Sequence, residues 1–203
     1  MNDALYHIVR IPAWLVINFA FLPKVYNAKS LRFRQSCIVI ANHTSNWDPI
    51  LLGHLVFPVC LKYMAKEELF KPGFLKKFFT AMGVIPVGRG KGDLKAMKLA
   101  LATLKNGKSL GIFPEGHRIT AGELGPFEIG PTVIALKTKT PVLPVYMDCR
   151  GYRIFRRVRV IAGEMLDLHA LAQGKSDGET VAQMTEVLRG KLNELKERLA
   201  QNG

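Results

Sequence analysis

The fold is decided by the stretch Cys37-Ile38-Val39-Ile40-Ala41 and the residues that follow it, Asn42-His43-Thr44-Ser45-Asn46-Trp47-Asp48-Pro49. The first five residues are a short apolar run, which predicts a buried strand. Asp48 and Pro49 predict the start of a helix, because Asp is a favoured N-cap and Pro is tolerated at the first helical position. His43 therefore leaves the end of a strand, and Asp48 opens the next helix.

The turn between this strand and this helix can fold back and bring the imidazole of His43 to the carboxylate of Asp48. Such a pair fixes the histidine tautomer and stabilises the imidazolium that forms when the ring takes a proton. Two plainer interpretations stay open from these residues alone. His43 can be only a polar residue at a sheet edge, and Asp48 can be only a helix cap.

The rest of the chain alternates between short apolar runs and longer stretches with helical periodicity. Further strands are expected at residues 61–65, 84–87, 109–113, 142–147 and 158–162. Helices are expected at residues 72–82, 93–105, 132–137 and 179–201, the last of them long and amphipathic. Strands that alternate with helices predict an α/β fold with a central, mostly parallel sheet covered by helices.

The helix expected at residues 72–82 carries an apolar stripe of aromatic and aliphatic side chains. The stripe consists of Phe74, Leu75, Phe78, Phe79 and Met82. Packing on the protein core is the preferred interpretation of such a stripe. The alternative is that it lines a groove for a hydrocarbon chain.

The charge of this chain of 203 residues indicates an anionic partner. Its net charge is +13, which suits nucleic acid, a membrane surface or a phosphorylated substrate. Two clusters contain no acidic residue: Arg10, Lys24, Lys29, Arg32 and Arg34, and then Arg150, Arg153, Arg156, Arg157 and Arg159. Each cluster can also be a solvated face that aids solubility.

Residues 11–23 carry no charge and include Trp14 between the flanking cations Arg10 and Lys24. As a helix they would span about 20 Å, which is short of the roughly 30 Å hydrocarbon core of a bilayer. An apolar helix with a flanking aromatic residue and cations favours a position in the membrane interface. The alternatives are a helix packed on the core and, least favoured, a membrane-spanning helix. We therefore expect a membrane-interface helix in residues 1–27 and a single α/β domain in residues 28–203.

Two more loops follow expected strands. Gly88-Arg89-Gly90-Lys91-Gly92 could let backbone N–H groups approach a phosphate, or could be a flexible connection. Phe113-Pro114-Glu115-Gly116-His117-Arg118 lies at a carboxyl strand end, where open α/β sheets bind ligands. Arg118 could grip a phosphate with two parallel hydrogen bonds, or could form a surface ion pair.

Cysteines and histidines give no metal signature. Cys37, Cys60 and Cys149 are far apart with no C-x-x-C spacing, which favours reduced thiols in a cytosolic protein. Histidines occur on two strand-end loops, but H-E-x-x-H and a second carboxylate at useful spacing are missing from the sequence. No metal is expected.

Taken in order, the motifs resemble those of the glycerolipid acyltransferases, and most closely those of the bacterial 1-acyl-sn-glycerol-3-phosphate acyltransferases. Asn42-His43 with Asp48 resembles the N-H-x4-D motif, and Lys66-Glu67-Glu68-Leu69 resembles K-x-E-L. Gly83-Val84-Ile85-Pro86-Val87-Gly88-Arg89 is similar to the second motif, which ends in Arg. The loop 113–118 resembles F-P-E-G-T-R, and Pro141-Val142-Leu143-Pro144-Val145 resembles the fourth motif. The resemblance covers residues 38–146.

The resemblance implies transfer of a fatty acyl group from acyl-CoA or acyl carrier protein to the free hydroxyl of lysophosphatidic acid, without a cofactor. His43 would be the general base and Asp48 its orienting partner. Glu115 would orient an Arg or Lys, and Pro144 would back the site. The substrate-binding set is then Asn42, Lys66, Arg89, Glu115, Gly116, His117, Arg118 and Pro144. The expected location is the cytoplasmic face of the cell membrane, as a peripheral or monotopic protein on an anionic surface.

Two departures from the family pattern affect the choice of acceptor. His117 stands where the family has Thr or Ser, and Gly88 stands where it has Asp. Alternative acceptors are glycerol-3-phosphate, another lysolipid or an acylated amino-acid lipid. A more distant alternative is a non-catalytic basic module that binds membranes or nucleic acid. Nucleic acid is not expected, because the sequence has no RNP-type aromatic pattern, zinc finger or helix-turn-helix signature.

Overall fold

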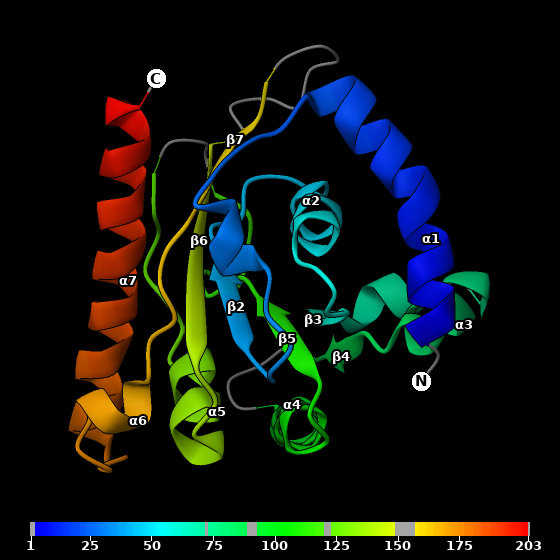
Figure 1. The fold of residues 1–203 in the computed structure, drawn as a ribbon. Coiled ribbons are helices and arrows are strands. Elements are labelled where there is room, and N and C mark those ends of the chain that lie inside the picture. Colours follow the sequence, from blue (N-terminus) through cyan, green and yellow to red (C-terminus); the bar gives the residue numbers. More distant parts are fainter. Residues whose placement is uncertain (1–2, 72, 89–92, 120–122, 149–156, 203) are drawn as a thin grey trace.

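The computed structural model describes residues 3–71, 73–88, 93–119, 123–148 and 157–202 (Figure 1). Its centre is a seven-stranded sheet in the order β1-β7-β6-β2-β5-β3-β4. The strands are β1 (Lys24–Tyr26), β2 (Ile38–Ala41), β3 (Leu61–Lys66), β4 (Ile85–Val87), β5 (Ser109–Ile112), β6 (Val142–Asp148) and β7 (Arg159–Ala162). Every neighbouring pair is parallel except β6 with β7. The expected mostly parallel sheet is confirmed.

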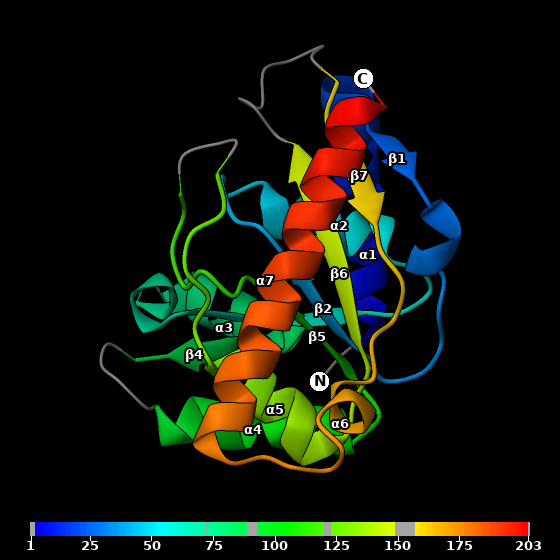
Figure 2. The same cartoon turned by 90° about the vertical axis from the view of Figure 1, so that its left-hand side faces the viewer.

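Helices cover both faces of this sheet. They are α1 (Asp3–Val16), α2 (Asp48–Leu55), α3 (Gly73–Met82), α4 (Leu94–Lys105), α5 (Gly130–Thr138), α6 (Leu168–Leu171) and α7 (Gly178–Gln201). Single turns follow α1 (Ile17–Phe21), β1 (Ala28–Leu31) and β3 (Glu67–Phe70). In Figure 2, α7 lies in front of the sheet and α1 behind it. The chain therefore forms three layers, as a parallel sheet with two apolar faces requires.

The strand β2 lies between β6 and β5. It shows how the sheet packs against helices on each of its two faces. Its side chains alternate, because successive residues of a strand point to opposite faces. Val39 and Ala41 join the cluster that includes Leu51 and Leu52 of α2. Ile38 and Ile40 join the opposite cluster, which includes buried residues of α4, α5 and α7. A strand buried on both faces explains why the run 37–41 is apolar without alternation.

The N-terminal helix is longer than expected, and little of it is buried. The stretch Ala4–Phe21 is long and apolar enough to cross a membrane, and only 17% of it is buried. The sheet begins soon afterwards with β1, which lies within the segment 1–27 that was assigned to this helix. This three-residue edge strand was not predicted, because Lys24-Val25-Tyr26 is too short to show a period.

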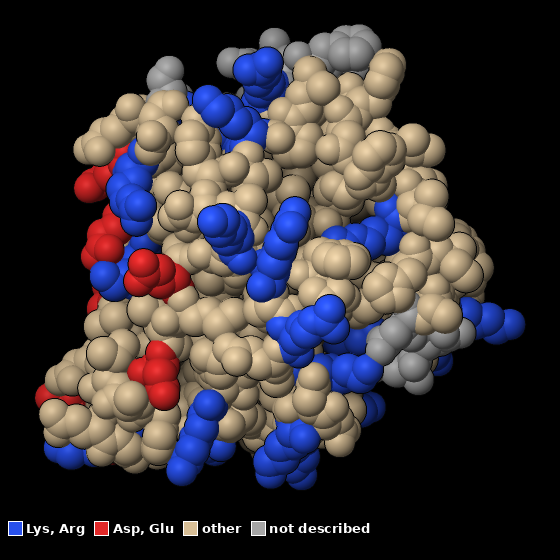
Figure 3. All heavy atoms as spheres, in the orientation of Figure 1, with Lys and Arg blue, Asp and Glu red and all other residues tan. Residues whose placement is uncertain are grey.

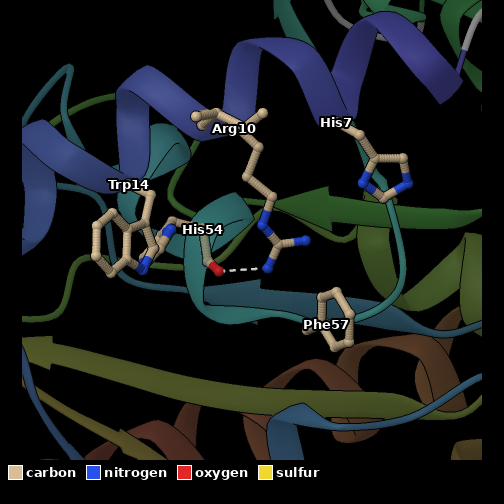
Figure 4. A pocket seen from close by; sticks show the side chains of 6 residues that line it. His7, Arg10, Trp14, His54 and Phe57 are labelled. Carbon is tan, nitrogen blue, oxygen red and sulfur yellow. Dashed lines mark hydrogen bonds between the residues drawn. The ribbon is translucent and has the colours of Figure 1, made fainter.

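Arg10 fastens α1 to the body of the protein (Figure 4). Its guanidinium donates to the carbonyl oxygens of His54 and Val56, the second at 2.8 Å, and it lies over the ring of Phe57 at 5.1 Å. The C-terminal carbonyls of a helix carry partial negative charge, so a cation is stabilised there. This contact fixes which side of α1 meets the protein and which side stays exposed.

The apolar stripe of α3 differs from the preferred expectation. None of the described residues of this helix is buried, so core packing is wrong for the stripe as a whole. Phe74 is 73% exposed and Phe78 is 37% exposed. The helix lies at the edge of the molecule beside α1 (Figure 1), where the sheet offers it no wide apolar surface.

Buried thiols are found where the apolar runs place them. Cys37 and Cys60 are both buried, as expected. Burial raises the pKa of Cys37 to about 12, so this thiol stays protonated and unreactive at neutral pH. Cys149 lies outside the described residues.

Candidate active site

The motif residues converge because of the sheet topology. The strands β2, β5, β3 and β4 are mutually parallel neighbours, so their carboxyl ends lie along one edge of the sheet. The loop 42–47 leaves β2 at this edge, and the loop 113–119 leaves β5 beside it. This edge of an open α/β sheet is where ligands bind.

The imidazole of His43 meets the carboxylate of Asp48 as the turn geometry predicts. The distance from Nδ1 of His43 to Oδ2 of Asp48 is 2.9 Å. An ionised carboxylate only accepts hydrogen bonds, so Nδ1 carries the proton and Nε2 is the unprotonated ring nitrogen. The His43 side chain keeps 19% of its surface exposed, whereas Asp48 keeps 1%. A buried carboxylate therefore orients a ring that solvent or substrate can reach.

Asp48 is held by the loop that precedes it and does not cap its own helix. Trp47 occupies the N-cap position, and Asp48 is the first residue of α2, one place later than expected. Its Oδ2 accepts hydrogen bonds from the backbone amides of Thr44 at 2.6 Å and Ser45 at 2.7 Å. Three donors converge on one oxygen, so the carboxylate has a single orientation toward His43.

The second loop supports His43 from the other side. Phe113 stacks on the imidazole with ring centroids 4.3 Å apart. Oε2 of Glu115 accepts a hydrogen bond from the backbone amide of His43 at 2.7 Å. Burial raises the pKa of Glu115, against the lowering effect of that hydrogen bond. Among the described residues, this carboxylate bonds to the His43 backbone, whereas an Arg or Lys was the expected partner.

The Asn42 side chain bonds to the protein backbone, whereas a contact with substrate was expected. Its side-chain amide donates to the carbonyl of Met147 at 2.9 Å, and its oxygen accepts from the Met147 amide at 2.8 Å. Asn42 is only 1% exposed. The side chain therefore bridges the end of β2 to β6 directly before His43.

Three of the cationic candidates are exposed around the same edge. Lys66 ends β3, and His117 and Arg118 follow Glu115 on the loop after β5. Between them and Phe113, Gly116 has a φ of +69°, a backbone conformation that residues with a side chain rarely adopt. This turn directs the chain from the buried Glu115 to the exposed pair. Arg89 lies outside the described residues.

Pro144 does not reach the loop cluster. It lies within β6 in register with Ile40, and its carbonyl accepts from the amide of Gly163 at 2.8 Å. A Cβ on Gly163 would come within 2.9 Å of the proline ring. Pro144 therefore packs on the chain after β7, and it backs the sheet more than the site.

Charge is distributed unevenly over the surface of the molecule. Acidic side chains gather at the side formed by α7, while lysines and arginines are spread over the rest of the visible face (Figure 3). Arg159 of β7 pairs with Asp148 of β6 at 2.7 Å, and Lys24 of β1 lies in register with Arg159. Members of both basic clusters thus meet at the site edge. Among the described residues, no group of three His, Cys, Asp or Glu side chains could hold a metal ion.

Comparison with known proteins agrees with this geometry. The acyltransferase family model matches residues 23–148, which contain the His43–Asp48 pair and the loop after β5. The chain belongs to the acyltransferase family. A 1-acyl-sn-glycerol-3-phosphate acyltransferase of Bacillus subtilis is 32% identical to this acyltransferase, over 88% of this chain and 90% of the relative.

Two other relatives carry the same name or a close one. A 1-acyl-sn-glycerol-3-phosphate acyltransferase of Borreliella burgdorferi is 32% identical over 60% of this chain and 49% of its own. The crystal structure of a 1-acyl-sn-glycerophosphate acyltransferase from Thermotoga maritima aligns with a TM-score of 0.65 and 28% identity. That alignment covers 88% of this acyltransferase and 73% of the Thermotoga chain.

Some residues that build the site were not among the expected site residues. Phe113 has a signal in the sequence, since an aromatic residue opens the loop directly after a strand. The backbone amides of Thr44 and Ser45 have none, because any residue except proline supplies an amide. Met147 has none either, since its role is to present backbone groups to Asn42.

Proposed function

We propose that this acyltransferase moves a fatty acyl group from the thioester of acyl-CoA or acyl carrier protein to the free hydroxyl of 1-acyl-sn-glycerol-3-phosphate, giving phosphatidic acid. The observation that carries the proposal is the 2.9 Å contact between His43 and an Asp48 carboxylate that two loop amides hold in place. Relatives named as acyltransferases of this acceptor support its choice.

The geometry supports direct attack by the acceptor oxygen. Nε2 of His43 takes the proton of the hydroxyl as the oxygen attacks the thioester carbonyl. Asp48 stabilises the imidazolium that forms, as in other histidine–carboxylate pairs. The tetrahedral intermediate then collapses, the C–S bond breaks, and the imidazolium returns its proton to the leaving thiolate. The products are an ester and a free thiol, so no cofactor enters the balance.

The exposed cations at the strand ends are assigned to the phosphate of the acceptor. Arg118 offers a planar fork that suits two phosphate oxygens, and Lys66 and His117 lie along the same edge. Arg89 completes this set by resemblance. Glu115 then serves the site through the His43 backbone, where its carboxylate accepts the amide proton.

The acceptor and the product are lipids, so the enzyme must reach a membrane surface. We assign this contact to the exposed apolar side of α1, at the cytoplasmic face of an anionic membrane. On α1 and the turn after it, Ile11 is 67% exposed, Trp14 is 52% exposed and Phe19 is 71% exposed. Helices with such an apolar side and flanking cations lie in the interface plane.

The test compares acyl transfer to lysophosphatidic acid by wild type and His43→Ala, in detergent, with a long-chain acyl-CoA and with acyl carrier protein as donors. Loss of a positioned base lowers the rate by about 10² to 10⁴. His169→Ala, on α6 far from the strand ends, is the matched control and should keep full activity. Transfer to glycerol-3-phosphate but not to lysophosphatidic acid would overturn the proposed acceptor and keep the mechanism. Full activity of folded His43→Ala would overturn the mechanism.

A further inference from the structure

The helix α3 has an apolar stripe that the protein covers on one side only. At 3.6 residues per turn, Phe74 and Phe78 lie along one line of the helix, and Leu75, Phe79 and Met82 lie beside them. The second group is half-buried, and it faces the protein. Phe74 and Phe78 are left at 73% and 37% exposure. Both rings thus remain in solvent in the isolated chain.

This helix is fixed in place despite having no buried residue. Lys62, which is fully buried in β3, donates from Nζ to the carbonyl of Met82 at 3.2 Å. The amide of Val84 donates to the carbonyl of Phe79 at 2.9 Å, and Gly83 between them has a φ of +74°. These contacts form a regular helix C-terminus. The end of α3 is therefore held, and its exposed stripe has a defined direction.

Short helices gain most of their stability from the burial of an apolar face. A ten-residue helix that fully buries no side chain leaves part of its apolar face available for a further contact. Such a stripe marks an interaction surface when it continues into a larger apolar patch. The neighbouring helix is apolar too, because α3 contacts α1, and α1 exposes Ile8 at 63% and Ile11 at 67%. Arg10 fixes the orientation of α1 from the opposite side (Figure 4).

The charges around the stripe identify the partner. Lys71, Lys76 and Lys77 are exposed, and the sequence has no acidic residue from Leu69 to Gly92. Apolar rings flanked by lysines suit an anionic lipid surface, where each cation contributes about 1 kcal/mol. A second copy of the chain would bring these lysines against themselves. The same lysines beside two exposed rings therefore favour a bilayer over self-association.

We propose that α3 is a second membrane contact, in which Phe74 and Phe78 enter the headgroup region of an anionic bilayer and Lys77, beside them on the helix, meets lipid phosphates. The inference rests on the membrane location given under the proposed function. Lys66 lies only a few residues before α3, across the turn Glu67–Phe70. Contact through α3 as well as α1 therefore holds the carboxyl edge of the sheet at the lipid surface.

The first test places a fluorescent reporter on the stripe. Phe74→Trp is made in a Trp14→Phe, Trp47→Phe background, and Leu171→Trp in the same background is the matched control. Leu171 is 53% exposed on α6, which lies across the molecule from α3 (Figures 1 and 2). With phosphatidylglycerol vesicles, the reporter at position 74 should shift to shorter wavelength and be quenched by brominated acyl chains. The reporter at position 171 should do neither. A water-like spectrum at position 74 in vesicle-bound protein would overturn the proposal.

The second test measures vesicle partition by sedimentation. Phe74→Ser with Phe78→Ser should lower the partition constant about tenfold, as expected for two partly inserted rings. Leu171→Ser should leave it unchanged. Acyl transfer in detergent should stay at the wild-type rate in both variants. This readout separates failure of the inference from failure of the proposed function.

Three other outcomes would also overturn the inference. Unchanged partition of the α3 variant, together with lost partition of Trp14→Ser with Phe19→Ser, would assign the membrane contact to α1 alone. A spectral shift at position 74 that needs acyl carrier protein would identify an acidic protein as the occupant. A shift that follows protein concentration without vesicles would identify a second copy of the chain.

Discussion

Asp48 is the residue on which the geometry of the site depends. Its Oδ2 accepts from the His43 ring and from two backbone amides. Asp48→Asn removes the charge that stabilises the imidazolium. It also introduces a side-chain amide, which is itself a donor, next to the three groups that donate to Oδ2. We expect kcat to fall by about 10² to 10⁴, with a much smaller change in KM.

Ser45→Ala is the control for this prediction. It keeps the backbone amide that donates to Asp48, and it removes only a hydroxyl that accepts from the amide of Trp47 at 3.3 Å. Steady-state kinetics with lysophosphatidic acid as the varied substrate check both variants. An Asp48→Asn enzyme with wild-type kcat would show that His43 needs no carboxylate.

Glu115 predicts a dependence of stability on pH. Burial raises the pKa of this carboxyl above its ordinary value of 4.5, so the folded state binds the proton more tightly than the unfolded state does. Stability from this group is therefore complete below pH 4.5 and is lost as pH rises through the folded pKa. Glu115→Gln keeps an acceptor for the His43 amide and removes the buried charge.

Urea unfolding of wild type and Glu115→Gln across pH 4 to pH 8 checks this effect. Relative to wild type, the variant should gain free energy of unfolding as pH rises above 4.5, because only the wild type then carries a buried charge. Glu123→Gln, at an exposed position, should show no such trend. A variant that loses stability as pH rises would contradict the burial argument.

Asn42 acts at the scale of the elements, because it joins two strands through a side chain. It forms two hydrogen bonds to the backbone of Met147, a residue 105 positions away. Asn42→Ala leaves a buried amide and a buried carbonyl without these partners. The free energy of unfolding should fall by about 1–3 kcal/mol.

Chemical denaturation measures this loss, with Asn46→Ala as the matched control. Asn46 is exposed in the same loop, so its replacement should change the free energy of unfolding little. If Asn42→Ala kept wild-type stability and lost activity, Asn42 would act on substrate after all. The substrate-binding role expected from the resemblance would then be restored.

The whole molecule carries a net charge of +13, and this predicts a salt dependence of membrane binding. Raising ionic strength from about 0.1 M to about 1 M shortens the Debye length from about 10 Å to about 3 Å. Partition onto phosphatidylglycerol vesicles should fall at least about tenfold. Acyl transfer to short-chain acceptors in neutral detergent should change less. If partition did not change with ionic strength, apolar contact alone would hold the enzyme on the vesicle.

The sequence by itself determined the features that depend on residues close together in the chain. The strands and helices followed from apolar runs and helical periods. The meeting of His43 and Asp48 followed from a strand-to-helix turn that spans only five residues. Asp93 caps α4, with its carboxylate accepting from the amides of Lys95 and Ala96, as its place before the helical pattern predicted.

Tertiary structure decided what depends on which elements become neighbours. The fold places the Glu115 carboxylate next to the backbone amide of His43, which is 72 residues away in the sequence. It also makes the Asn42 side chain a donor to the backbone of Met147 in β6. It also leaves Phe74 and Phe78 uncovered, although their helical period is that of a core helix. Periodicity identifies an apolar face but does not say what covers it. Coverage depends on the place of α3 at the edge of the sheet, which the order of the strands fixes.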